Sequence, residues 1–184
     1  RKTPNGVELR VHPTMIPEKR LIANVNGVMN AVLVNGDAVG PTLYYGPGAG
    51  AEPTASAVVA DIVDVARTLT AEPGHRVPYL AFQQTALNDT PILDIGETET
   101  AYYLRMSAED RPGVLSRIAQ ILSDAGISIE AIIQKEPAEG QSRVPLIILT
   151  SRAVEKELSA AISDIEQLDS ITGDVMRIRV ESLG

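Results

Sequence analysis

Residues 110–129, DRPGVLSRIAQILSDAGISI, decide the fold of the second half of this 184-residue chain. Apolar side chains recur from residue 112 to residue 125 at intervals of three and four positions, which is typical of a helix with one buried face. These apolar positions are Val114, Leu115, Ile118, Ile121, Leu122 and Ala125. The pattern therefore predicts a helix that covers one face of a sheet.

Strand-like segments flank this helix on both sides, and a second amphipathic helix follows them. The predicted strands are residues 98–106, 128–134, 144–150 and 173–180, and the second helix is residues 154–168. The order β-α-β-β-α-β is that of the ferredoxin-like fold, an antiparallel sheet of four strands with both helices on one face. We therefore expect an α+β chain whose second sheet face is open to another subunit.

The first half of the chain shows other patterns. Val7, Leu9 and Val11 alternate with Glu8 and Arg10, which predicts a strand with those two charged side chains in water. The opening residues RKTPNG carry turn chemistry and lead straight into this strand-like segment, so we expect an upstream portion of the protein. A division into two domains, residues 1–94 and 95–184, is the expected organisation.

An Asn-Gly pair at residues 35 and 36 lies between two apolar runs, which predicts a β-hairpin. From Pro53 onward, apolar residues at helical spacing predict a helix that reaches Leu69, with the charged positions in water. Residues 70–94 are rich in proline and predict a loop, with a short strand at residues 79–82.

Three glycines and a proline, GPGAG at residues 46–50, stand directly before this helix. Glycines let a ligand approach the backbone closely, and a helix N-terminus offers free N–H groups to an anion or to a polar cofactor edge. A tight turn between a strand and a helix explains the same residues without any ligand. The spacing is not the G-x-G-x-x-G fingerprint of dinucleotide-binding folds.

Composition excludes several classes of protein. The net charge is −8 and no basic stripe interrupts it, so we expect no nucleic-acid partner. There is no cysteine, and His12 and His75 lie far apart, so we expect no disulfide and no metal site. The longest apolar run, residues 144–149, is much shorter than the roughly 20 residues that span a bilayer. We expect a soluble, cytoplasmic protein with no membrane partner.

Several of these stretches together resemble a known family. The segments HPTMIP (12–17), LIANVNGVMNAVLVNGDAVG (21–40) and YYGPGAGAEPTASAVVADI (44–62) resemble the later part of the catalytic domain of bacterial homoserine dehydrogenases. Residues 110–129 resemble the start of an ACT domain, the regulatory appendage of that family. The resemblance implies a partial catalytic and dimerisation domain in residues 1–94, followed by an ACT domain in residues 95–184.

The resemblance also implies an activity, namely the NADP- or NAD-dependent interconversion of L-homoserine and L-aspartate 4-semialdehyde. This reaction belongs to the biosynthesis of threonine, methionine and isoleucine. The Rossmann domain, the catalytic lysine and the acidic substrate-binding residues of the family have no match here, so no catalytic residue is assigned. The implied cofactor-binding residues are Gly48, Ala49, Gly50 and Glu52, and the implied substrate-cleft residues are His12 and Thr54. For His12, a structural role in a hydrogen bond to the backbone is an equal alternative.

The loop before residue 114 is the candidate regulatory site. Asp110 and Arg111 offer polar side chains, Gly113 permits close approach, and the helix N-terminus offers N–H donors to the carboxylate of an amino acid such as threonine. The implied ligand residues are Asp110, Arg111, Gly113, Val114 and Leu115, with Ile127 across a subunit interface in a homodimer or homotetramer. A loop that only caps a helix remains equally open. The alternative function is a non-catalytic module that binds an amino acid and drives oligomerisation.

Overall fold

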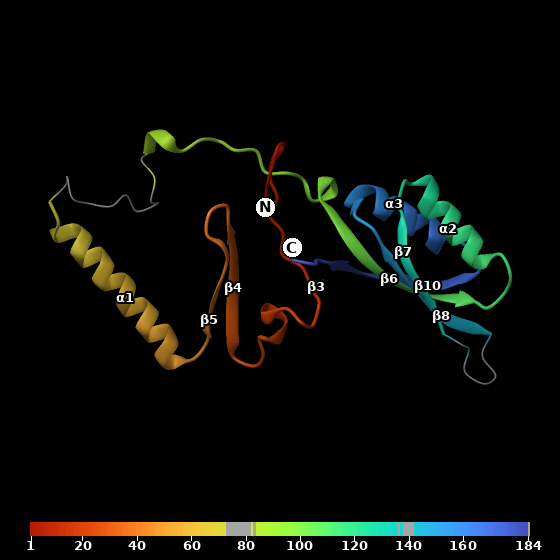
Figure 1. The fold of residues 1–184 in the computed structure, drawn as a ribbon, viewed down its shortest axis with the longest axis horizontal. Helices are drawn as coiled ribbons and strands as arrows, with labels where there is room; N and C mark the ends of the chain where they lie inside the picture. The colour runs from red at the N-terminus through yellow and green to blue at the C-terminus, as the bar shows by residue number, and fades with distance from the viewer. Residues whose placement is uncertain (73–81, 83, 136, 138–141, 184) are drawn as a thin grey trace. The chain divides into compact units, whose positions relative to one another are not determined.

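The structure is a computed structural model, and it describes residues 1–72, 82, 84–135, 137 and 142–183. The chain forms two compact units, which are drawn in Figure 1. Unit 1 comprises residues 1–17 and 90–184, and unit 2 comprises residues 18–89. The first 17 residues thus pack with the second half of the chain, although the sequence patterns group them with the first half.

Unit 1 contains the predicted β-α-β-β-α-β order, and the predicted α+β fold is confirmed. Its elements are β6 (Glu99–Glu109), α2 (Val114–Asp124), β7 (Ile129–Gln134), β8 (Arg143–Thr150), α3 (Glu155–Glu166) and β10 (Ile171–Val180). The four strands lie in the order β10-β6-β8-β7, and every neighbouring pair is antiparallel. Figure 1 shows α2 and α3 together on one side of this sheet.

Alternation along β6 explains why this sheet has one covered face. Tyr102, Leu104 and Met106 point toward the helices and are buried, whereas Arg105 on the other face is exposed. The helices contribute the same apolar positions that the sequence pattern identified, among them Ile118, which is completely buried. Burial of these branched side chains is the main stabilising contribution to unit 1.

Short elements at the margins of unit 1 were not predicted. These are β1 (Lys2–Thr3), β2 (Gly6–Val7), β3 (Thr14–Met15), β9 (Ala153–Val154) and the 3-10 turn η4 (Ile95–Glu97). Strand β3 pairs in parallel with β10 and extends the main sheet by one strand, while β9 pairs with β6. The amino-terminal residues are therefore part of the edge of this sheet.

The strand predicted around residues 7–11 is wrong in both extent and orientation. Only Val7 lies in a strand, Leu9 and Val11 are exposed, and the carboxylate-bearing Glu8 is buried. The cause is electrostatic, because Glu8 forms ion pairs with Arg1 at 2.9 Å and with Arg10 at 3.5 Å. Burial raises the pKa of Glu8, but the hydrogen bond from Arg1 and the charges of Arg1 and Arg10 lower it more, so the net pKa is below its usual value.

Unit 2 contains the predicted hairpin and helix. Strands β4 (Met29–Gly36) and β5 (Gly40–Pro47) pair in antiparallel register around a loop at residues 37–39. Asn35 and Gly36, expected to form the turn, are instead the last paired residues of β4. Helix α1 (Ala51–Thr70) begins two residues before Pro53. The remaining described elements are two 3-10 turns, η1 (Leu21–Asn24) and η3 (Gln84–Ala86). The short strand expected at residues 79–82 lies outside the described residues, except for Phe82.

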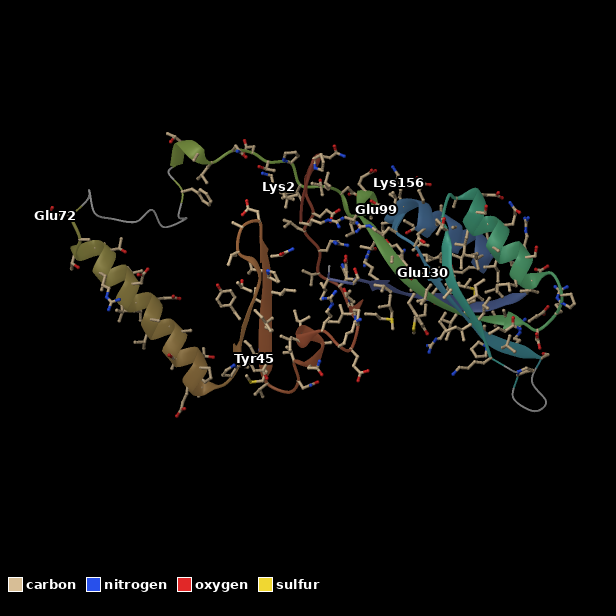
Figure 2. All side chains as sticks on the ribbon, viewed as in Figure 1. Lys2, Tyr45, Glu72, Glu99, Glu130 and Lys156 are labelled. Atoms are coloured by element: carbon tan, nitrogen blue, oxygen red, sulfur yellow. The ribbon has the colours of Figure 1, made fainter. Side chains whose placement is uncertain are left out.

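None of the residues of α1 is buried, although its apolar side chains fall at helical spacing. Val58, Val59 and Ile62 are 52%, 57% and 62% exposed, and Tyr44 and Tyr45 on β5 are 66% and 58% exposed. Figure 2 shows the side chains of α1 and of the hairpin, where Tyr45 is labelled. Within the described part of the chain, unit 2 has a regular backbone but no apolar core.

Candidate functional site

The glycine-rich corner lies between β5, which ends at Pro47, and α1, which begins at Ala51. Gly50 caps the helix with φ +121° and ψ 158°, a backbone conformation that residues with a Cβ rarely adopt. Its carbonyl accepts a hydrogen bond of 3.2 Å from the Thr54 amide. Gly50 is therefore explained by the geometry of the turn itself.

Gly48 is explained by packing. A Cβ at this position would lie 2.7 Å from Cγ of Asn30, whose side chain rests against the Gly48 backbone. The Asn30 amide donates to the Val28 carbonyl at 3.4 Å, and the Gly48 amide donates to that same carbonyl at 3.4 Å. Asn30 thus supports the corner, as a polar side chain with local partners. The sequence patterns gave no signal for this contact.

The corner also presents surface that a ligand can use. Gly48, Ala49, Gly50, Glu52 and Thr54 are all exposed. The first turn of α1 carries the partial positive charge of a helix N-terminus, and Glu52 is the acidic residue in that turn. The geometry is therefore compatible with both interpretations of the sequence, a tight turn and a corner open to a cofactor.

His12 has local hydrogen-bond partners. Its Nδ1 lies 2.9 Å from Oγ1 of Thr14 and 3.1 Å from the Pro13 carbonyl, and the side chain is half-buried. His12 belongs to unit 1, whereas Thr54 belongs to unit 2. A substrate cleft that contains both residues therefore stays a prediction.

The loop predicted to bind an effector is exposed and well ordered by hydrogen bonds. Oδ1 of Asp110 accepts a hydrogen bond of 2.9 Å from Gln134, at the end of β7. Nε of Arg111 donates to Glu109 at 2.6 Å. Gly113 has φ +91° and caps α2, so a glycine is required there.

Two of the predicted regulatory residues have side chains that point into the core. Val114 is 7% exposed and Ile127 is 4% exposed, so only their backbone groups remain for a ligand, while Leu115 is half-buried. Ile127 follows the C-terminal end of α2, and Gly113 precedes its N-terminal end. An 11-residue helix is about 16 Å long. A ligand site that uses both ends therefore requires a second copy of this unit, as the sequence-based interpretation expects.

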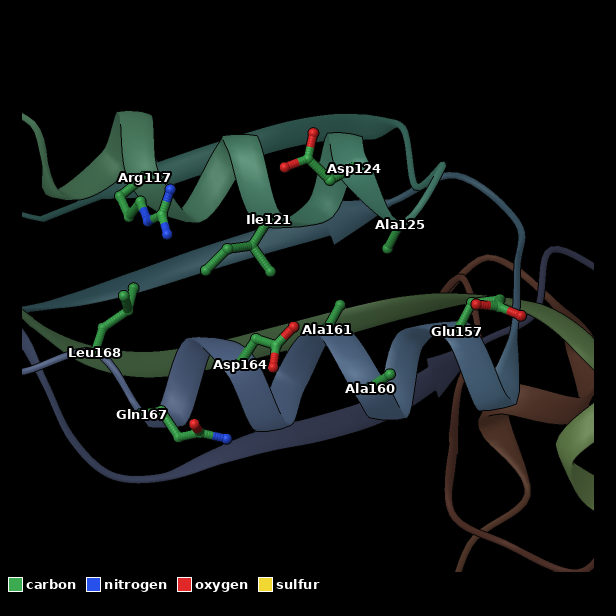
Figure 3. A pocket seen from close by; sticks show the side chains of 10 residues that line it. All are labelled: Arg117, Ile121, Asp124, Ala125, Glu157, Ala160, Ala161, Asp164, Gln167 and Leu168. Atoms are coloured by element: carbon green, nitrogen blue, oxygen red, sulfur yellow. The ribbon is translucent and has the colours of Figure 1, made fainter.

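A groove between α2 and α3, with a volume of about 510 Å³, was not predicted from the sequence (Figure 3). Arg117 stands on the wall formed by α2, and Asp164 and Glu157 stand on the wall formed by α3. Ile121 and Ala161 form part of its apolar lining. The sequence places these charged residues on the outer sides of two amphipathic helices, where solvated positions are the ordinary expectation.

The described residues contain no group of three or more histidine, aspartate or glutamate side chains that could hold a metal ion. Over the same residues, no helix is long and apolar enough to cross a membrane.

Two family models match the chain: the homoserine dehydrogenase model over residues 2–63, and the ACT domain model over residues 102–169. A solved homoserine dehydrogenase from Thiobacillus denitrificans is 63% identical to this chain with a TM-score of 0.90, over all of this chain and 41% of that one. The whole chain is thus similar to part of a homoserine dehydrogenase. The expected ferredoxin-like ACT fold in the second half is thereby confirmed as well.

Curated homoserine dehydrogenases give the same result. The protein from Pseudomonas aeruginosa is 61% identical over 183 residues, and the one from Neisseria gonorrhoeae is 55% identical over 183 residues. Both matches span all of this chain and 42% of the relative. The chain thus spans less than half the length of the homoserine dehydrogenases that it matches.

Proposed function

We propose that this chain forms part of an NAD(P)-dependent homoserine dehydrogenase that interconverts L-homoserine and L-aspartate 4-semialdehyde. The observation that carries the proposal is the 63% identity and TM-score of 0.90 to a solved homoserine dehydrogenase over the whole chain. The reaction transfers a hydride between the hydroxyl-bearing carbon of homoserine and the nicotinamide ring. The pathway to threonine, methionine and isoleucine and a cytoplasmic location belong to the same proposal.

The glycine corner has a defined part in this proposal. Its exposed backbone at residues 48–50 lies against the nicotinamide end of the cofactor, with Glu52 nearby, while His12 and Thr54 line the substrate cleft. Exposure of the corner and the absence of a Cβ at Gly48 and Gly50 support this role. The choice between NADP and NAD depends on residues that contact the ribose, and no residue of this chain is assigned to them.

The apolar surface of unit 2 supports the same assignment. A helix with one apolar stripe is stable when the stripe is packed, yet Val58, Val59 and Ile62 are exposed among the described residues. Contiguous exposed apolar surface is characteristic of an interface. In the proposed enzyme this surface packs against the catalytic part of the protein or against a second subunit.

Residues 95–184 are proposed to act as the regulatory domain, with threonine as the effector. The exposed Asp110 and Arg111 and the left-handed Gly113 support an amino-acid site in this loop. The separation of this loop from Ile127 by the length of α2 favours a site shared by two subunits, in a homodimer or homotetramer.

An assay of the full-length protein tests the proposal. We expect NAD(P)-dependent oxidation of L-homoserine, and inhibition by threonine but not by lysine, methionine or isoleucine at equal concentration. Oxidation of another hydroxy acid in preference to homoserine would overturn the substrate assignment. An inactive full-length protein that is nevertheless stabilised by one of these amino acids would instead identify the non-catalytic binding module.

A further inference from the structure

Residues 6–15, which we call the latch segment, contact the chain just before the ACT sheet begins and again at the end of its last strand, β10. At one end, the Val7 amide donates to the Pro91 carbonyl at 2.8 Å and the Leu93 amide donates to the Val7 carbonyl at 3.0 Å. Residues 91–93 lead into β6. At its other end the latch segment forms β3, which pairs with the last two residues of β10. The latch segment therefore links residues 91–93, which precede the sheet, to the end of β10, which is the last strand of the sheet.

Charged side chains reinforce the contact with the end of β10. Nη2 of Arg10 lies 3.1 Å from Oε1 of Glu181 and 3.5 Å from Oε2 of Glu8. The side chains of Glu8 and Arg10 are only 4% and 14% exposed. Removing one member of a buried ion pair leaves the other charge without compensation, so such pairs hold their elements in one specific arrangement. The Glu181 amide also donates to the Met15 carbonyl at 3.0 Å.

Little apolar packing holds the latch segment in place. Leu9 is 63% exposed, Val11 is fully exposed, and β3 is only two residues long. The apolar core of unit 1 is built from β6, β8, β10 and the two helices, and it includes none of these residues. Segments with few buried apolar contacts open at a lower free energy than the core. The latch segment can therefore detach from β10 while the ACT core stays folded.

His12 lies within the latch segment, between Arg10 and Thr14. Thr14, two residues further on, pairs with Arg179 of β10 through its backbone and contacts Nδ1 of His12 through its hydroxyl. The orientation of the imidazole thus depends on the position of the last strand of the ACT sheet.

From these contacts we propose that the latch segment transmits effector binding from the ACT domain to the substrate cleft, with the Arg10–Glu181 ion pair as its lock and Thr14 as a positioning residue for His12. The proposal rests on the function proposed above. The latch segment can be attached to β10 or detached from it, and an effector that binds one of these two states more tightly shifts the equilibrium between them. With the lock intact, threonine binding favours the attached state and inhibits the enzyme.

The lock is tested in the full-length protein with Arg10→Met and Glu181→Gln. The matched control is Lys156→Met, which removes an exposed ion pair of 2.8 Å with Glu97 elsewhere in the same unit. We expect hydrogen exchange at residues 8–15 to become at least about tenfold faster in both lock variants, while residues 102–108 and 144–150 exchange as in the wild type. The threonine concentration for half-inhibition should rise at least about fivefold, and the control should behave as the wild type.

Two results would overturn the proposal. The first is faster exchange at residues 8–15 with an unchanged response to threonine, since the segment would then carry no signal. The second is a wild-type protein in which none of threonine, lysine, methionine and isoleucine slows hydrogen exchange at residues 8–15. This exchange measurement does not depend on catalysis. If the full-length protein had no dehydrogenase activity but threonine still slowed exchange at residues 8–15, the proposed function would be contradicted. The proposed response of the latch segment to the effector would still hold.

The positioning role of Thr14 has its own test. Thr14→Val removes the hydroxyl next to His12 and keeps the β3 backbone, whereas Thr14→Ser keeps the hydroxyl. We expect Thr14→Val to raise the KM for homoserine several-fold with little change in the KM for the cofactor, and Thr14→Ser to restore the wild-type value. Equal kinetics for the two variants would exclude the link from β3 to His12.

Discussion

The hydroxyl of Tyr102 donates a hydrogen bond of 2.8 Å to the carboxylate of Glu155, inside the ACT domain. Tyr102 is completely buried on β6, and Glu155 is 5% exposed at the first position of α3. Nε of Arg179 donates to the same carboxylate oxygen at 3.0 Å, and Nη1 of Arg177 lies 3.0 Å from the other. One buried carboxylate therefore joins β6, α3 and β10.

Glu155→Gln should destabilise the ACT domain by about 3 kcal/mol, because two arginines lose the charge that compensates them. Urea unfolding of wild type and variant measures this difference. Glu157→Gln, two residues further along α3 and exposed, is the control and should change the free energy of unfolding by less than about 0.5 kcal/mol. Equal effects of the two substitutions would show that the network contributes nothing specific.

Tyr102 should resist ionisation. Burial raises the pKa of its hydroxyl, the neighbouring Thr100 lowers it, and the bond to Glu155 with the charge of that carboxylate raises it again, so the net pKa lies above 10.0. The stability contributed by the neutral hydroxyl is present below pH 10, the unfolded value, and is lost as pH rises through the folded pKa. Ultraviolet titration should show one late step that Tyr102→Phe abolishes. A variant that titrates like the wild type would refute this assignment.

Gly48 and Asn30 should be energetically coupled. Gly48→Ala places a Cβ against the exposed Asn30 side chain, which must turn away and lose its hydrogen bond to the Val28 carbonyl, at a cost of about 1 kcal/mol. In an Asn30→Ala background the same substitution should cost clearly less, because the obstructing amide is gone. A double-mutant cycle on the full-length protein, followed by thermal unfolding, measures the difference. Additive effects would mean that the corner relaxes away from Asn30.

Ile62 tests whether the apolar face of α1 is covered in the complete protein. It is 62% exposed among the described residues, so Ile62→Ala should change the stability of the isolated 184-residue chain very little. In the full-length protein the same change should cost about 2–4 kcal/mol, as for a buried isoleucine. Asp61→Ala, at the neighbouring position, should have little effect in either form. A neutral Ile62→Ala in the full-length protein would show that this face remains in water.

The ACT fold could be predicted from the sequence because apolar residues recur at a regular spacing along its helices and strands. The alternation through Tyr102, Leu104 and Met106 and the helical spacing through Ile118 and Leu122 each identify a buried face. Helix α1 could be predicted in the same way. The surface that packs against its apolar face could not be predicted, because helical periodicity identifies an apolar face but not the residues that it contacts.

Two local features escaped the sequence patterns because hydrophobic periodicity does not specify which polar side chains contact one another. The alternation around Glu8 predicted that its charged side chain would be in water, but ion pairs with Arg1 and Arg10 allow this side chain to be buried. Likewise, no local pattern indicates that Asn30 rests on Gly48. For the candidate site, sequence reasoning located the glycine corner and the loop before α2. The roles of both corner and loop remain predictions, since their ligands contact atoms that patterns do not specify.

The pairing of β3 with β10 also orders events during biosynthesis. Arg10 and Glu181 are 171 positions apart, so β3 has no strand to join until β10 has been synthesised. Contacts between such distant positions form late, because a long loop must close first. A nascent protein therefore leaves His12 and its neighbours without their contacts to β10 until that strand emerges from the ribosome.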